Sequence, residues 1–190
     1  FQFVSPEIFK ESQDLEVLER LESIFLSEEK RIVIGKPKVW YVYLLGLFYS
    51  LDEVAFLKAA KRLDLPNRIK NSLHEDRTHC RQSLKKLTSK NECGPLDIYH
   101  AFAKLSVEGI VFLIALSSTN RIYQYANIYF TQYQGRVEPS LTGNDLVKMG
   151  MEPGPVFKFV FNALREARIK GSVKSREEEI ALVEERFLKP

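Results

Sequence analysis

Apolar residues recur every three or four positions along most of the chain, which is the spacing of one buried face of an α-helix. Ser5 followed by Pro6 favours the start of a helix. The apolar stripe of this predicted helix consists of Leu15, Leu18, Leu21 and Phe25. Residues 39–48 are apolar on all sides and contain Trp40. This pattern predicts a buried central helix.

Capping signals mark the helices that follow. Ser50 and Glu53 form a capping-box pattern for a helix that runs to about Leu63. Pro66 opens a longer helix, whose predicted buried stripe is Ile69, Leu73, Cys80, Leu84 and Leu87. Residues 91–95 break the pattern and form a candidate boundary. Further helices are expected at residues 96–104, 107–117 and 120–133, with Gly135 after them.

The C-terminal part predicts three helices in series. Thr142 and Asp145 form a capping box for the first, and Gly150 supplies the left-handed residue that ends it. Pro-Gly-Pro at 153–155 fits the first turn of the second helix, whose apolar face carries Phe157, Phe161 and Leu164. After Gly171, the pair Ser175 and Glu178 repeats the capping box for the last helix.

Period-two alternation is never long enough to require a strand. The predicted fold class is therefore all-α, an array of helix-turn-helix units with about nine to ten helices. We expect a helical body at residues 1–135 and a helical tail at residues 136–190.

Several segments resemble the C-terminal signature of class II tRNA nucleotidyltransferases, which are the CCA-adding and A-adding enzymes and their bacterial poly(A) polymerase relatives. In the tail these are Leu-Thr-Gly-Asn-Asp-Leu at 141–146, Gly-Met-Glu-Pro-Gly-Pro at 150–155, Ala-Leu-Arg-Glu-Ala-Arg at 163–168 and Gly-Ser-Val-Lys-Ser-Arg-Glu-Glu-Glu at 171–179. Upstream, residues 38–47, 63–70 and 110–116 resemble the helical body of that family. The chain departs from the family at Lys158, where many members carry glycine.

The resemblance implies that body and tail bind the acceptor and TψC arms of tRNA, while a separate catalytic head adds nucleotides at the 3′ end. In this family the head holds Mg²⁺ and ATP or CTP with two aspartates separated by one residue. This chain contains no Asp-x-Asp sequence. We therefore expect no catalytic residue and no cofactor in this segment, and a head domain of the parent chain as its partner.

Composition describes an ordinary globular protein of 190 residues, with 45% hydrophobic and 28% charged residues. Its apolar runs are too short to span a bilayer, and no signal-peptide pattern opens it. Cys80 and Cys93 are too few for a disulfide framework, which favours the cytoplasm. The start at Phe1 rather than methionine suggests a piece of a longer protein.

Charge is uneven along the chain, although the net charge is only +3. Residues 1–30 hold three basic and eight acidic side chains, residues 58–90 ten basic and three acidic, and residues 158–176 six basic and one acidic. Two basic tracts favour a polyanion-binding surface. The alternative is that they are solvated helix faces.

Two other residue patterns do not predict a functional site. Residues 75–81 contain the letters of the family's nucleotide-selecting motif only loosely, so we interpret them as a solvated helix face. The histidines and cysteines lack metal-ligand spacing, so no metal site is expected.

The predicted RNA-binding residues lie in the tail: Gly154, Lys158, Arg165, Arg168, Lys170, Lys174 and Arg176. The N–H groups from Gly154 to Phe157 form a candidate phosphate site at a helix start. An exposed tyrosine among Tyr123, Tyr125, Tyr129 and Tyr133 would be able to stack on a base, and the sequence leaves open which are exposed. The alternative function is a helical protein-interaction scaffold.

Overall fold

The computed structural model describes residues 12–28 and 35–188, and the predicted helix start at Ser5 and Pro6 lies outside this part. The described residues form ten α-helices and no strand, as the sequence predicted. In chain order, the first nine are α1 (Ser12–Leu26), α3 (Val39–Tyr49), α4 (Glu53–Arg62), α5 (Asn67–Thr88), α6 (Pro95–Phe102), α7 (Val107–Leu116), α8 (Arg121–Ile128), α9 (Gly143–Lys148) and α10 (Val156–Lys170). The last is α11 (Arg176–Val183), and π-helical turns continue α8 and α11 as η1 (Tyr129–Tyr133) and η2 (Glu184–Leu188).

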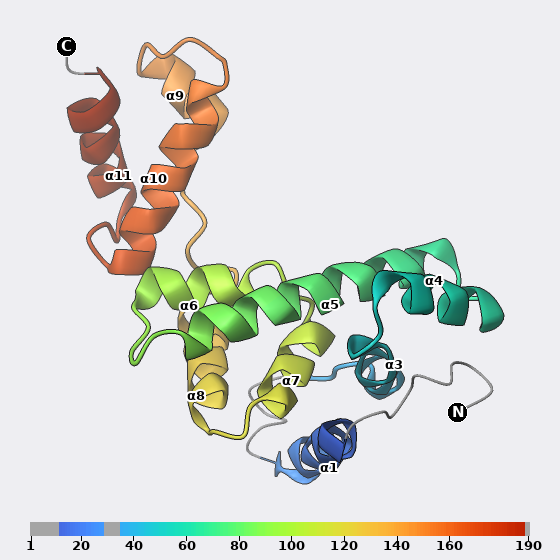
Figure 1. Cartoon of the computed structure of the whole chain (residues 1–190). Helices are drawn as coiled ribbons and strands as arrows, with labels where there is room; N and C mark the ends of the chain where they lie inside the picture. The colour runs from blue at the N-terminus through green and yellow to red at the C-terminus, as the bar shows by residue number, and fades with distance from the viewer. Residues whose placement is uncertain (1–11, 29–34, 189–190) are drawn as a thin grey trace.

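Buried apolar side chains form two clusters. The first joins α1 to η1, which we call the body, and the second joins α9, α10, α11 and η2, which we call the tail. Figure 1 shows the tail standing away from the body and meeting it near α6. At this junction α10 contacts α6, and Ile169 belongs to the first cluster. Residues 89–94 link α5 to α6 inside the body, so the boundary suggested at residues 91–95 is wrong.

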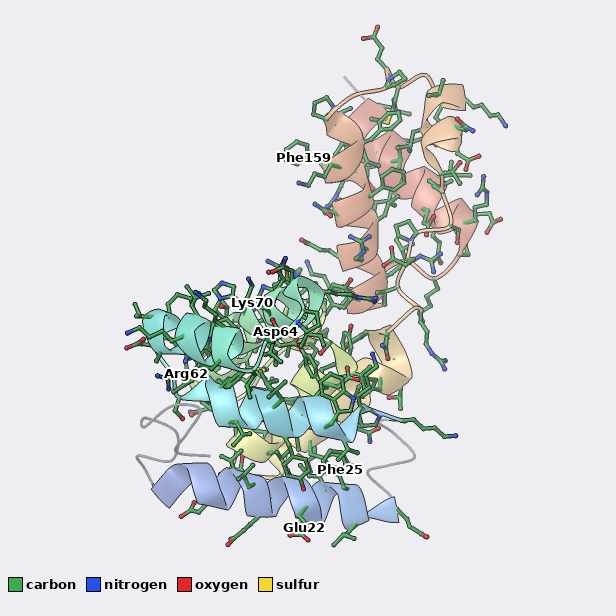
Figure 2. All side chains as sticks on the ribbon, turned by 90° about the vertical axis from the view of Figure 1, so that its right-hand side faces the viewer. Glu22, Phe25, Arg62, Asp64, Lys70 and Phe159 are labelled. Carbon is green, nitrogen blue, oxygen red and sulfur yellow. The ribbon has the colours of Figure 1, made fainter. Side chains whose placement is uncertain are left out.

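The outer helix of the body is amphipathic, as its apolar spacing predicted. Leu21 and Ile24 are buried. Figure 2 shows Glu22 pointing away from the body and Phe25 pointing toward the neighbouring helix, where its ring lies 6.0 Å from that of Tyr43. Burial of this face attaches α1 to α3 and α7.

Two local predictions for the next helices are wrong. Ser50 does not cap α4, because its backbone is still helical; Asp52 is extended and accepts a hydrogen bond from the Ala55 N–H at 2.8 Å. The helix at 39–48 is not buried on all sides. Trp40 is 53% exposed and Val39 is 45% exposed, whereas Tyr41 and Val42 in the same turn are buried.

The predicted solvated face at residues 75–81 is also wrong, because Asp76 and Arg77 are 3% and 2% exposed. Asp76 accepts hydrogen bonds from the Tyr41 hydroxyl at 2.9 Å and from the hydroxyl and N–H of Ser106 at 2.6 and 3.1 Å. A Cβ at Gly109 would lie 2.5 Å from the Asp76 carboxylate, so this close approach requires glycine. Asp76 thereby joins α3, α5 and the start of α7.

Arg77 is held inside the body. Its guanidinium donates to the Leu51 carbonyl and lies 4.3 Å from the centre of the Phe56 ring. Burial lowers the pKa of Arg77 to about 10. Arg77, which the charge count assigned to a basic surface, is therefore part of the core of the body.

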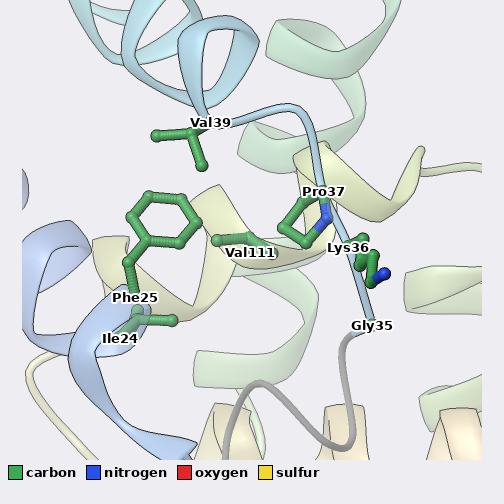
Figure 3. Close-up of a pocket in the computed structure, with 7 residues that line it drawn as sticks. All are labelled: Ile24, Phe25, Gly35, Lys36, Pro37, Val39 and Val111. Carbon is green, nitrogen blue, oxygen red and sulfur yellow. The ribbon is translucent and has the colours of Figure 1, made fainter.

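A hollow of about 300 Å³ lies between α1, α7 and the segment leading to α3. Figure 3 shows Phe25, Val39 and Val111 around it. Its described lining is apolar apart from Lys36. It therefore lacks the converging polar groups that chemistry on a bound ligand requires.

No single helix among the described residues is long and apolar enough to cross a membrane; only α6 and α7 taken together would pass on length and composition, and they are bent by 114°.

Candidate nucleic-acid interface

The predicted RNA-binding residues lie along α10 and at its two ends. Pro155 is the N-cap of α10, so the Pro-Gly-Pro turn precedes the helix. Gly154 is exposed and has open space where a side chain would be. The Phe157 N–H donates to the Gly154 carbonyl at 3.1 Å, and Pro155 has no N–H. The candidate phosphate site is thus reduced to the N–H groups of Gly154 and Val156.

The three lysines of the set are exposed. Lys158 follows the Pro-Gly-Pro turn, and neither it nor Lys174 forms an ion pair with a described residue. Lys170 lies 4.0 Å from Glu166, one helical turn earlier, in a pair that is open to solvent. Such a pair is weak. All three ammonium groups are therefore accessible to an external anion.

The arginines are bound to carboxylates of the tail. Arg165 donates to Glu138 at 2.8 Å, and this hydrogen bond raises the pKa of Arg165. The side chain of Arg168 is 15% exposed; it pairs with the Glu179 carboxylate and donates to the Ser140 hydroxyl at 2.6 Å. Arg168 therefore serves the interior of the tail more than its surface.

Glu179 is the centre of this arrangement, and sequence reasoning missed it. Its carboxylate is fully buried and accepts the N–H groups of Ser140 and Leu141 at 3.0 and 2.9 Å, as well as the Arg168 guanidinium. One acidic side chain thus holds α11, α10 and the segment before α9 together. The only sequence signal was its place in the run of three glutamates after Ser175.

Both capping boxes predicted for the tail are present. Asp145 accepts from the Thr142 N–H and hydroxyl at 2.8 and 2.7 Å and pairs with Arg176 at 2.8 Å. Ser175 and Glu178 form the second box, at the start of α11. Gly150 and Gly171 have φ of +93° and +73°, as expected of residues that end helices.

The Asp145 box predicts acid sensitivity. Hydrogen bonds from Thr142, together with Arg176, lower the pKa of Asp145 to about 2. Because the pKa in the unfolded chain is about 3.9, the ionised group stabilises the folded tail above about pH 4, and this stabilisation is lost as pH falls to about 2. Asp145→Asn should therefore flatten the dependence of the thermal midpoint on pH between 4 and 2, measured by circular dichroism. The matched variant Glu152→Gln, at an exposed carboxylate that forms no ion pair with a described residue, should keep the wild-type slope; equal slopes for both variants would contradict the assignment.

Aromatic side chains are distributed differently from the expectation. Tyr123, Tyr129 and Tyr133 are each 7% exposed, and the half-buried Tyr125 accepts the Cys93 N–H at 3.2 Å. Three of the four tyrosines are therefore buried, and the hydroxyl of the fourth is engaged. Phe159 is instead 66% exposed, beside Lys158, and Figure 2 shows it pointing outward from α10. The core role of Phe157, Phe161 and Leu164 is confirmed, since all three pack in the tail cluster.

The second basic tract, at 58–90, is partly neutralised within the body. Arg77 is buried, Arg81 donates to the Leu51 carbonyl at 3.3 Å, and Lys86 and Lys90 both pair with Asp97 at 3.6 and 2.8 Å. The other basic side chains of the tract are exposed or half-buried.

The fold of this chain is similar to that of solved CCA-adding enzymes. The enzyme of Thermotoga maritima in complex with tRNA matches 96% of this chain and 43% of its own, with a TM-score of 0.72 and 17% identity. A CCA-adding enzyme in complex with ATP matches 99% of this chain and 44% of its own, with a TM-score of 0.74 and 16% identity. At this identity, the likeness concerns the fold.

Sequence comparison gives the particular relatives. An A-adding tRNA nucleotidyltransferase of Geobacter sulfurreducens is 26% identical over 185 residues, which are 95% of this chain and 21% of that protein. One from Halalkalibacterium halodurans is 30% identical over 73 residues, which are 38% of this chain and 17% of that protein. No protein-family model matches the chain. The resemblance to tRNA nucleotidyltransferases is confirmed, and the chain spans about a fifth of the length of these curated relatives.

Proposed function

We propose that this chain is the tRNA-binding body and tail of a tRNA nucleotidyltransferase and that it binds the acceptor and TψC arms. The observation that carries the proposal is the match of nearly the whole chain to the fold of a CCA-adding enzyme in complex with tRNA. The accessible lysines of the tail support it, because they supply the cations that a phosphate backbone needs.

The accessible charges are spread along the length of α10 and into the turn that follows it. From Lys158 to Lys170 the axis of α10 rises about 18 Å at 1.5 Å per residue, and Lys174 follows in the turn to α11. A-form RNA is bound largely through its shape, phosphates and 2′-hydroxyls. Cations spaced along one helix suit contacts to several phosphates, and such contacts release counterions.

The members of the set differ in their proposed roles. Lys158, Lys170 and Lys174 contact phosphates, and Gly154 leaves the start of α10 open to the RNA backbone. Arg165 and Arg176 contact RNA from the exposed edges of their ion pairs, and Arg168 mainly positions the neighbouring segments. Phe159 provides an aromatic surface on which a base can stack.

We assign the addition of CCA or of the terminal A to the parent protein. That reaction needs a pair of carboxylates holding Mg²⁺ at the nucleotide phosphates, and the residues of this chain do not fit that role because no Asp-x-Asp is present. The proposed partners are thus tRNA and the catalytic head of the parent chain, with the cytoplasm as the proposed location.

Removing two free lysines tests the interface. The double variant Lys158→Ala, Lys174→Ala should bind an acceptor–TψC minihelix more weakly at low salt, and the slope of log K against log salt should fall by about one for each lysine. Fluorescence anisotropy of labelled RNA measures both. The matched control Lys36→Ala, Lys104→Ala removes two exposed charges from the body and should bind as the unsubstituted chain does. Equal losses in both variants would favour nonspecific attraction, and no binding by any of them would favour the protein-interaction scaffold.

A further inference from the structure

A second cavity lies where three helices of the body begin. It has a volume of about 480 Å³ and opens between the starts of α3, α5 and α7. Its walls include Trp40, Ile69 and Glu108, and the cations Lys38 and Arg68. This cavity is larger than the apolar hollow beside α1 and, unlike it, combines an aromatic ring with charged groups.

The aromatic wall is unusual for its exposure. Trp40 is 53% exposed although it stands on a helix whose Tyr41, Val42 and Leu45 are buried. Its indole meets the Tyr41 ring edge-on at 5.7 Å, and nothing described stacks on it. A flat apolar surface in a cavity favours a planar ligand, and every nucleobase has such a face.

The charges around Trp40 favour an anion. Lys38 and Arg68 are exposed, and neither side chain pairs with a described carboxylate. The carboxylate of Glu108 accepts the N–H of Lys38 at 2.9 Å, so one of its oxygens is held at the start of α3. Two cations therefore stand with one partly engaged carboxylate at the mouth of the cavity, and the Asp76 carboxylate is buried behind Tyr41 and Ser106.

We propose that this cavity binds one unpaired nucleotide of RNA, with the base on Trp40 and its phosphate at Arg68 and Lys38. A paired base in a duplex has both faces covered by its neighbours, so only a splayed nucleotide reaches the indole. The inference deepens the proposed function and rests on it for the identity of the polymer. It assigns to the body a contact separate from the tail lysines, which track the backbone of the duplex.

Trp40 is the only tryptophan of the chain, so its fluorescence reports this cavity directly. Titration with an eight-nucleotide single-stranded oligoadenylate should quench the emission saturably, whereas a blunt RNA duplex should leave it unchanged. Arg68→Glu should weaken the single-strand affinity about tenfold. Glutamate suits the first turn of α5 because of the helix dipole, so loss of the fold does not explain such a result. The matched variant Lys104→Glu makes the same change in charge at an exposed site between α6 and α7 that does not line the cavity, and it should keep the affinity.

Trp40→Ala, measured by anisotropy of the labelled oligonucleotide, should also lose about tenfold, as expected for one stacked base. Absence of quenching, or equal affinities for Arg68→Glu and Lys104→Glu, would overturn the proposal. Quenching by AMP with the same affinity as the oligonucleotide would overturn the RNA assignment in favour of a free nucleotide. Binding of a blunt acceptor–TψC minihelix, followed by anisotropy, reports the tail alone, so failure there without failure of quenching contradicts the proposed function and not this cavity.

Discussion

Glu179→Gln is expected to destabilise the chain by about 3–5 kcal/mol, the range for removing one partner from a buried ion pair. The carboxylate accepts two backbone N–H groups and the Arg168 guanidinium in a site closed to water. Glutamine offers a single acceptor oxygen, and its own N–H groups would face donors. Arg168 then loses its counter-charge inside the tail.

Urea unfolding followed by circular dichroism measures the effect, and hydrogen exchange locates it. The amides of Ser140 and Leu141 should lose protection in the variant because their acceptor is weakened. The matched control is Glu177→Gln, two residues earlier on the same helix and exposed. A free energy of unfolding for Glu179→Gln within about 0.5 kcal/mol of the control, the usual range for surface changes, would show that Glu179 does not hold the tail.

Asp76→Ala is expected to cost about 3 kcal/mol, because it leaves several buried donors without an acceptor. The hydroxyl of Tyr41 and both donors of Ser106 point at this carboxylate. Burial and the neighbouring Asp76 also raise the pKa of Tyr41 well above its usual range. Asp76→Asn retains one acceptor oxygen and should cost less.

The neighbouring Glu75→Ala is the control, since Glu75 is exposed on the same turn of α5. The free energy of unfolding from urea titration should fall in the order Glu75→Ala, Asp76→Asn, Asp76→Ala. The same free energy for Asp76→Ala and Glu75→Ala would mean that the three hydrogen bonds contribute nothing net, and the description of Asp76 as the link between α3, α5 and α7 would be wrong.

Local sequence rules predicted the helices and most of their ends. The boxes at Thr142 and Ser175 succeed because both partners lie within four residues, so the sequence contains the whole interaction. The rule failed at Ser50, where a better acceptor, Asp52, lies two residues later and takes the cap. Choosing between neighbouring caps depends on where the preceding helix releases the chain, which local pattern does not determine.

The burial of charged residues was predicted least well, for a physical reason. Arg77 and Glu179 count as surface residues by composition, and their burial depends on partners far along the chain. The partners are the Leu51 carbonyl for Arg77 and the segment at Ser140 for Glu179. A charge pattern in one helix carries no information about such partners.

The positions of the basic residues in the tail were predictable from the sequence, but their ion pairs and their accessibility were not. The basic residues of the tail are where the sequence placed them, yet Glu138 and Glu179 bind two of the arginines and leave the lysines accessible. The exposure of Trp40 was not predicted, because residues 39–48 are apolar on all sides, whereas Phe159 lies off the apolar stripe of Phe157, Phe161 and Leu164. Accessibility is a property of the assembled helices.

The proposed function is recognition of the acceptor and TψC arms of tRNA by this chain. The most direct measurement is the affinity of the purified chain for an acceptor–TψC minihelix and for a DNA duplex of equal length, each titrated across salt. We predict a clear preference for the RNA at every salt concentration, with affinity that falls steeply as salt rises, because several phosphates are contacted. Equal weak affinities for RNA and DNA, with the same salt dependence, would contradict the claim.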